Sequence, residues 1–165
     1  MRPHDACTTQ TGLRVQSAGE KEANWMRTID TFLNQIRLWA AQEPEPTPVL
    51  LVGSYARGQA RADSDVDLVI ITATPQHYLE DESWLHAFGM VQSVQLEDWG
   101  MVQSQRVFYA DMEVEFGITT PAWAHIDPVD AGTARVVRDG AQIIHDPAGM
   151  LARLLNTVND QRTAT

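Results

Sequence analysis

The sequence predicts an α/β fold in which helices flank a β-sheet. Two short apolar runs rich in β-branched residues, at 48–52 and 66–72, have the length of buried strands. Apolar residues also recur at helical spacing over 24–41, and residues 112–118 alternate strictly between apolar and polar. With 165 residues the chain is long enough for one domain with a sizeable core.

Turn signals separate the remaining elements. We expect helices over 24–41, 54–60, 74–89 and 146–158, and strands over 48–52, 66–72, 91–96, 101–109, 112–118, 135–137 and 142–144. Asn24 is the expected N-cap of the first helix, and the proline-rich stretch 43–48 ends it. The last two strands are expected to form a hairpin across Asp139-Gly140.

A Gly53-Ser54 pair directly follows the first predicted strand and opens the short helix. Glycine tolerates positive φ and lets a phosphate approach the backbone, while Ser54 offers a hydroxyl and an amide. The free amides of a helix N-terminus also attract anions. This turn is therefore a candidate phosphate-binding site.

Asp65 and Asp67 lie two residues apart at the start of the next strand, so their side chains share one face. Val66 and Leu68 then point to the core. Adjacent carboxylates repel unless a cation lies between them, and oxygen ligands suit Mg²⁺. A solvated turn at Asp63 is the alternative, but it leaves Asp67 without a partner inside an apolar strand.

Gly53-Ser54, Ala56-Arg57-Gly58 and Asp65-Val66-Asp67, placed between two apolar strands, resemble the signature of the DNA polymerase β-type nucleotidyltransferase superfamily. Among its members, the small bacterial antibiotic nucleotidyltransferases and minimal nucleotidyltransferases are the most similar. The likeness covers about residues 48–72 and implies a polymerase β-like core with a mixed sheet flanked by helices.

The resemblance also calls for a third carboxylate on a neighbouring strand. Glu115 is the first choice because it lies deeper in its strand and precedes the apolar Phe116. Glu113 is the second choice, and Asp111 belongs to the preceding turn. The alternative is an ordinary amphipathic strand whose glutamates are solvated.

By this resemblance, Asp65, Asp67 and Glu115 are the expected catalytic residues and the ligands of one or two Mg²⁺ ions. The acceptor hydroxyl would attack the α-phosphorus of ATP or another nucleoside triphosphate, and pyrophosphate would leave. Either Glu115 or Glu113 can take the proton, since the sequence does not separate a ligand from a base.

Gly53, Ser54 and Arg57 are the expected nucleotide-binding residues, with the Arg57 guanidinium as a clamp on the phosphates. The alternative, which we favour for Arg57, is a surface arginine one turn into a helix. Arg61 and Arg106 are weaker candidates of the same kind.

The expected function is transfer of a nucleoside monophosphate, AMP from ATP, to a hydroxyl of a small molecule. The resemblance points to an aminoglycoside- or lincosamide-like antibiotic. A formal net charge of −10 disfavours nucleic acid as a partner and fits a small cationic acceptor.

Two alternatives stay open. The first is a minimal-nucleotidyltransferase antitoxin that binds and nucleotidylates a protein toxin. The second is a catalytically silent nucleotide sensor, and the intact Asp65, Asp67 and Glu115 count against it. Because only one helix follows the last hairpin, a second subunit of a homodimer is a further expected partner that would complete the acceptor site.

The ends of the chain are polar. We expect a flexible leader over 1–20, a single nucleotidyltransferase domain over 21–160 and a tail over 161–165. The leader has no apolar signal core and no run is long enough to span a membrane, so the expected location is the cytoplasm. Trp99 is expected to pack locally in its turn, or else to offer a platform for a base or sugar.

Overall fold

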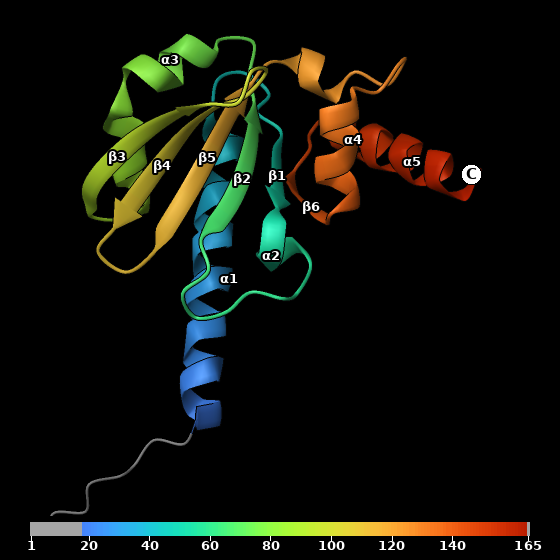
Figure 1. The fold of residues 1–165 in the computed structure, drawn as a ribbon. Helices are drawn as coiled ribbons and strands as arrows, with labels where there is room; N and C mark the ends of the chain where they lie inside the picture. The colour runs from blue at the N-terminus through green and yellow to red at the C-terminus, as the bar shows by residue number, and fades with distance from the viewer. Residues whose placement is uncertain (1–17, 165) are drawn as a thin grey trace, which may run out of the picture.

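A computed structural model describes residues 18–164, with side chains from Ile29 onward (Figure 1). Most of the predicted leader, residues 1–17, lies outside the described residues. The elements, in chain order, are α1 (Ala18–Gln42), β1 (Val49–Val52), α2 (Gly53–Ala56), β2 (Val66–Ile71), α3 (Pro75–Glu80), the 3₁₀ helix η1 (Glu82–Phe88), β3 (Val91–Asp98), β4 (Gln103–Tyr109), β5 (Glu113–Thr119), the 3₁₀ helix η2 (Pro121–Ala124), α4 (Ala131–Arg138), β6 (Ala141–His145) and α5 (Met150–Thr163).

The six strands form one mixed sheet in the order β3-β4-β5-β2-β1-β6. Strands β2 and β5 run parallel, and every other neighbouring pair is antiparallel. This confirms the predicted fold class. The register places Asp67 of β2 beside Glu115 of β5, and Glu115 in turn beside Arg106 of β4. Three charged side chains from three strands therefore emerge in one row across the sheet.

Helices α1, α3 and η1 cover one face of the whole sheet (Figure 1). From α1, the buried side chains Ile29, Phe32 and Ile36 pack under the strands, as the helical spacing predicts. The opposite face is covered by η2, α4 and α5 over β6, β1 and β2. Among the described residues, no helix covers the β4–β5 part of that face, and the row of charged residues lies there.

Alternation along β5 decides which side chains reach each face. Val114 and Phe116 are fully buried on the α1 side, and Phe116 packs edge-on against Trp84 with ring centroids 5.0 Å apart. Because neighbouring residues of a strand point to opposite faces, Glu113 and Glu115 are directed to the uncovered face. The aromatic packing beneath β5 thus fixes the orientation of the glutamates above it.

The predicted hairpin over 135–144 is wrong, because residues 131–138 form helix α4. The Asp130 carboxylate accepts a hydrogen bond from the backbone N–H of Thr133 at 3.0 Å, which is a helix N-cap. Thr133, Ala134 and Val137 then form the buried face at helical spacing. Two successive β-branched valines in the sequence outweighed this cap signal. Only the second predicted arm is a strand, β6, and it pairs with β1.

Several predicted helix boundaries also differ. Asn24 is not an N-cap, since α1 begins at Ala18 and the alanine- and glutamate-rich segment before Asn24 favours a helix. Helix α2 ends at Ala56 instead of residue 60, and the helix predicted over 74–89 is split at Asp81, whose extended backbone separates α3 from η1.

The final helix begins four residues later than predicted, at Met150. The Asp146 carboxylate accepts hydrogen bonds from the N–H groups of Leu151 and Ala152 at 3.1 and 2.9 Å, so Asp146 caps the helix across an intervening turn. The helix continues to Thr163, beyond the predicted end at Val158. No helix in the described part of the chain is long and apolar enough to cross a membrane.

Candidate metal centre

Gly53 provides the space for the carboxylate of Asp67. It adopts a positive φ of 72° at the end of β1, where the register sets Val52 opposite Asp67. A Cβ atom built on Gly53 would overlap Asp67 Oδ2. The glycine of the predicted phosphate turn is therefore also required by the adjacent carboxylate, a role that sequence reasoning did not assign to it.

Asp65, Asp67 and Glu115 come together on the uncovered face of the sheet. Each offers one carboxylate oxygen, and these three oxygens lie within 4.8 Å of one another. We call these three residues the carboxylate triad. All three side chains are half-buried, and hard oxygen donors at this spacing fit a divalent cation. The structure thus places the two predicted aspartates and the first-choice glutamate in one candidate divalent metal site, and Glu113 outside it.

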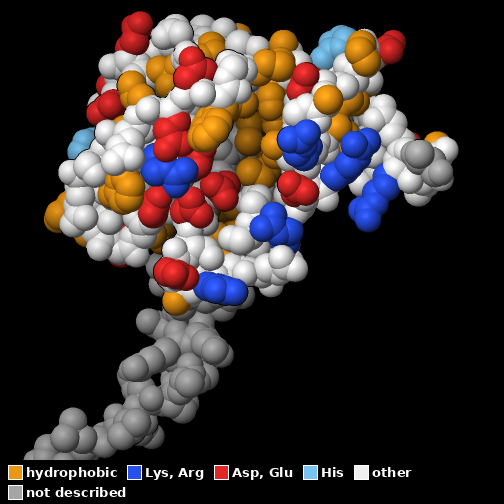
Figure 2. Space-filling model, viewed as in Figure 1, with side chains coloured by type: hydrophobic (Ala, Val, Ile, Leu, Met, Phe, Trp, Pro, Cys, Tyr) orange, Lys and Arg blue, Asp and Glu red, His pale blue; other side chains and the backbone are white. Residues whose placement is uncertain are grey.

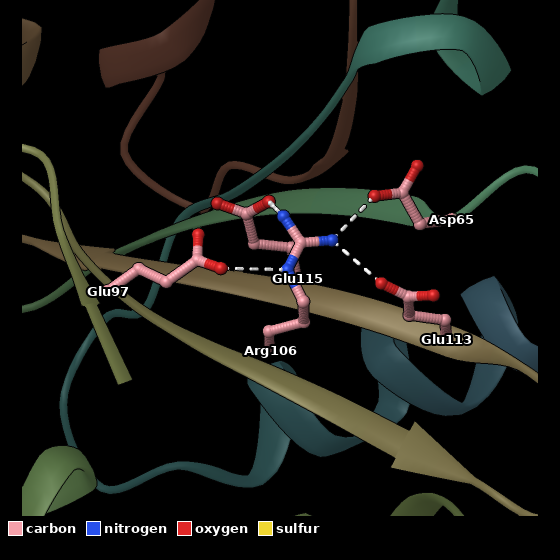
Figure 3. A network of polar contacts seen from close by, with 5 residues as sticks. All are labelled: Asp65, Glu97, Arg106, Glu113 and Glu115. Carbon is pink, nitrogen blue, oxygen red and sulfur yellow. Dashed lines mark hydrogen bonds and ion pairs between the residues drawn. The ribbon is translucent and has the colours of Figure 1, made fainter. Parts of the chain in front are cut away.

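Arg106 connects the triad to two further glutamates (Figure 3). From β4 its Nη1 donates to Asp65 Oδ2 at 2.9 Å and to Glu113 Oε1 at 2.7 Å. Its Nη2 donates to Glu115 Oε2 at 2.7 Å, and its Nε to Glu97 Oε1 at 3.0 Å. The guanidinium therefore neutralises part of the charge of four carboxylates with charge-assisted hydrogen bonds.

Burial raises the pKa of Asp67 from 3.8 to about 7, and repulsion from Asp65 and Glu115 adds to this increase. The positive charges of Arg106 and Arg57 act in the opposite direction without cancelling it. Near pH 7 the Asp67 carboxyl of the metal-free protein is therefore divided between its neutral and ionised forms. A cation bound there competes with a proton, so its affinity should increase as the pH rises through 7.

A pocket of about 370 Å³ opens next to the triad. Trp99, Trp123 and Val136 contribute to its largely apolar wall, and Asp67 and Glu115 stand at its edge. Figure 2 shows this hydrophobic hollow on the same face as a group of acidic side chains that surround a basic one. Trp99 lines this pocket with 65 % of its surface exposed. Its local packing and its role as a platform for a base or sugar stay predictions.

The other predicted nucleotide-binding residues, Ser54 and Arg57, lie in and directly after helix α2. Ser54 is in the single turn of α2, next to Gly53. Arg57 follows α2, and its Nη1 donates to the carbonyl oxygen of Asp139 at 3.3 Å. Arg57 thus lies close enough to Asp67 to lower its pKa but forms no ion pair with the triad. Their role in binding a nucleotide stays a prediction.

Sequence reasoning underestimated Arg106 and missed Glu97. Arg106 appeared as a weak phosphate clamp, whereas it lies at the centre of the acidic cluster with only 21 % of its side chain exposed. Its place on a strand with alternating faces was the available signal, since the polar face of β4 adjoins that of β5. Glu97 belongs to β3, and no local pattern relates it to the triad.

A carboxylate triad that could hold a metal ion, on the open face of a mixed sheet, is the arrangement expected of the nucleotidyltransferase class that the sequence motif predicts. Residues 26–116, more than half of the chain, match the family model described as Streptomycin adenylyltransferase, and the protein belongs to that family. The matched region extends from α1 to Phe116 and so includes all three residues of the triad.

Solved structures with a similar fold include Cid1 in complex with the UTP analogue UMPNPP, with 18% sequence identity and a TM-score of 0.44 over 58% of this chain and 30% of Cid1. The non-canonical poly(A) polymerase complex GLD-2–GLD-3 gives 16% identity and a TM-score of 0.40 over 73% and 39% of the two chains. Terminal uridylyl transferase 4 from Trypanosoma brucei gives 16% identity and a TM-score of 0.34, over 56% of this chain and 34% of the transferase. The chain thus spans little more than a third, at most, of the length of these proteins. A comparison with curated protein sequences gives no significant match.

Proposed function

We propose that this protein transfers AMP from ATP to a hydroxyl group of an aminoglycoside. The carboxylate triad beside an open pocket, in a chain of the Streptomycin adenylyltransferase family, carries this proposal. Residues 21–160 would act as one nucleotidyltransferase domain in the cytoplasm.

The donor set of the triad fits Mg²⁺, because three carboxylate oxygens converge and no nitrogen or sulfur ligand from the described residues accompanies them. Asp65, Asp67 and Glu115 would hold the ion. When bound, it supplies positive charge that offsets the charge of the triphosphate and of the transition state. The residues themselves contribute a fixed arrangement, since Asp67 and Glu115 are anchored on paired strands and Asp65 directly precedes one of them.

The apolar pocket next to the triad is the proposed site of the nucleoside. Its volume of about 370 Å³ lies within the range of small-molecule pockets. The exposed Trp99 at its wall offers a flat surface on which an adenine ring can stack. Ser54 in α2 and Arg57 directly after it follow Gly53, which adjoins the Asp67 carboxylate, and they would bind the phosphates.

The carboxylates around the triad support a cationic acceptor. Glu97 and Glu113 flank Asp65 and Glu115 on the open face of the sheet, and Arg106 offsets only part of their negative charge. The amino groups of an aminoglycoside are positively charged at neutral pH, so they match these carboxylates. The net charge of −10 favours the approach of such an acceptor from solution.

In the proposed reaction the acceptor oxygen forms a bond to the α-phosphorus of ATP, and the bond between that phosphorus and the pyrophosphate oxygen breaks. The hydroxyl proton passes to a carboxylate or to water. Glu115 lies both in the triad and at the pocket edge, so it is the proposed proton acceptor. Glu113 lies outside the triad and is the weaker candidate.

The test is pyrophosphate release from ATP and Mg²⁺ with streptomycin, other aminoglycosides, a lincosamide or no acceptor. We expect release with an aminoglycoside and none with Asp67→Asn. Asp63→Asn is the matched control, because it removes an exposed carboxylate outside the triad and should keep full activity. Release that continues in the Asp67→Asn variant would contradict the assignment of the site. Release only with a lincosamide would keep the reaction and replace the acceptor.

A further inference from the structure

Arg106 divides its hydrogen bonds equally between two groups of carboxylates (Figure 3). Asp65 and Glu115 belong to the triad, whereas Glu97 and Glu113 do not. The guanidinium binds one oxygen of each, at distances between 2.7 and 3.0 Å. A guanidinium keeps its charge at any ordinary pH and presents its donors in a rigid plane. Arg106 is thus a permanent cation attached to two of the three proposed metal ligands.

A divalent ion held by the triad would lie close to this cation, because both would bind Asp65 and Glu115. Asp65 Oδ2 and Glu115 Oε2 are already engaged by Arg106, so an ion must either share these carboxylates with the guanidinium or displace it. Sharing brings two positive charges onto the same two carboxylates, and their mutual repulsion is unfavourable in a half-buried site. Displacement costs less than usual here, because Glu97 and Glu113 can retain the guanidinium within the acidic cluster.

We propose that Arg106 is an internal cation that occupies the carboxylate triad in the metal-free protein and competes with the divalent ion for Asp65 and Glu115. Entry of the ion moves the guanidinium toward Glu97 and Glu113. Arg106 therefore lowers the affinity of the triad for the metal. In the metal-free protein it also offsets the repulsion between the carboxylates. The proposal rests on the metal site of the proposed function.

The experiment is direct Mn²⁺ binding, measured through the electron paramagnetic resonance signal of free Mn²⁺. Arg106→Gln removes the competing charge while retaining hydrogen-bonding groups. We expect it to bind Mn²⁺ at least roughly tenfold more tightly than the wild type, since even in water two positive charges at contact repel appreciably. Arg162→Gln removes one charge from an exposed position in the last turn of α5 and is the matched control; its affinity should equal that of the wild type.

Arg106→Lys is a second variant. It preserves the positive charge that offsets the repulsion between the surrounding carboxylates in the folded protein. It loses the planar fork that joins four carboxylates, and its Mn²⁺ affinity should lie between those of the wild type and Arg106→Gln. Thermal unfolding in EDTA establishes that each variant is folded before binding is measured.

Unchanged or weaker Mn²⁺ binding by folded Arg106→Gln would overturn the proposal, because it would make Arg106 a support for the metal ligands and not a competitor. If neither the wild type nor any variant binds Mn²⁺, the metal site itself fails, and this proposal with it. The two failures are therefore distinguishable, and neither depends on catalytic activity.

Discussion

Replacing Asp67 with asparagine should stabilise the metal-free protein although it removes a metal ligand. In the folded protein the pKa of Asp67 is raised to about 7 from an ordinary value of 3.8, because the carboxyl is buried beside Asp65 and Glu115. The unfolded chain therefore loses this proton at a lower pH than the folded chain. Between these two pKa values the folded state binds more protons, so stability falls as the pH rises from about 4 to about 7.

The increase in the pKa of Asp67 from 3.8 to about 7 corresponds to a loss of about 4 kcal/mol in the free energy of unfolding once the pH is above both values. Asp67 is only half-buried, and solvent screening reduces this to about 2 kcal/mol. Asparagine has no charge to lose. The free energy of unfolding of the Asp67→Asn variant should therefore exceed that of the wild type by about 2 kcal/mol at pH 8. For a domain of this size this corresponds to an increase of roughly 4–8 °C in Tm. At pH 5 the gap should be smaller, because part of the Asp67 carboxyl is then protonated in the folded protein.

The assay is urea unfolding in EDTA at pH 5 and pH 8, followed by tryptophan fluorescence. Asp63→Asn is the control for a simple change of charge and should show no such gap, since Asp63 is exposed. Added Mg²⁺ should stabilise the wild type and leave Asp67→Asn unchanged. An Asp67→Asn variant that is less stable than the wild type at pH 8 would refute the electrostatic reasoning, as would a gap independent of pH.

Three further predictions concern the triad and the pocket. Glu115→Gln should lower kcat by about 100-fold or more, and Glu113→Gln by less than about tenfold, because only Glu115 belongs to the triad. If steady-state kinetics gave the reverse order, Glu113 would be the third carboxylate. Gly53→Ala should abolish Mn²⁺ binding, because the added Cβ atom would displace the Asp67 carboxylate. Gly58→Ala is the control: it carries similar backbone strain, but no atom lies within 4 Å of its Cβ position, so it should still bind Mn²⁺. Equal binding by both variants would reject this explanation. Trp99→Ala should raise the KM for ATP by about tenfold with little change in kcat, because it removes the surface on which the adenine stacks. The Tm should hardly change, since an exposed side chain contributes little to stability. An unchanged KM would remove Trp99 from the nucleoside site.

The region from β1 to β2 could be predicted from the sequence because its determinants are local. A turn glycine, two buried strands and the spacing of Asp65 and Asp67 all lie within 25 residues, and strand periodicity alone places both aspartates on one face. The alternation of β5 equally directs Glu113 and Glu115 to a common face. It does not choose between them, and that choice depends on the parallel register that sets Glu115 beside Asp67.

The features that were missed depend on contacts across the sheet. Arg106 reaches four carboxylates because β3, β4 and β5 are neighbours in one register, and no sequence window contains that information. Helix α4 was missed for a different reason, since the β-branched Val136 and Val137 favour a strand locally. Packing of its buried face on the sheet, together with the Asp130 cap, overrides that preference.

The most direct test of the account follows the two ends of the triphosphate separately. ATP labelled at the α-phosphorus, or in a parallel reaction at the γ-phosphorus, is incubated with Mg²⁺, the protein and the aminoglycoside that supports pyrophosphate release. The account predicts that the α label appears in the aminoglycoside and that the γ label leaves in pyrophosphate, with neither event in Asp67→Asn. Appearance of the γ label in the aminoglycoside would identify a phosphotransferase and contradict nucleotidyl transfer at the triad.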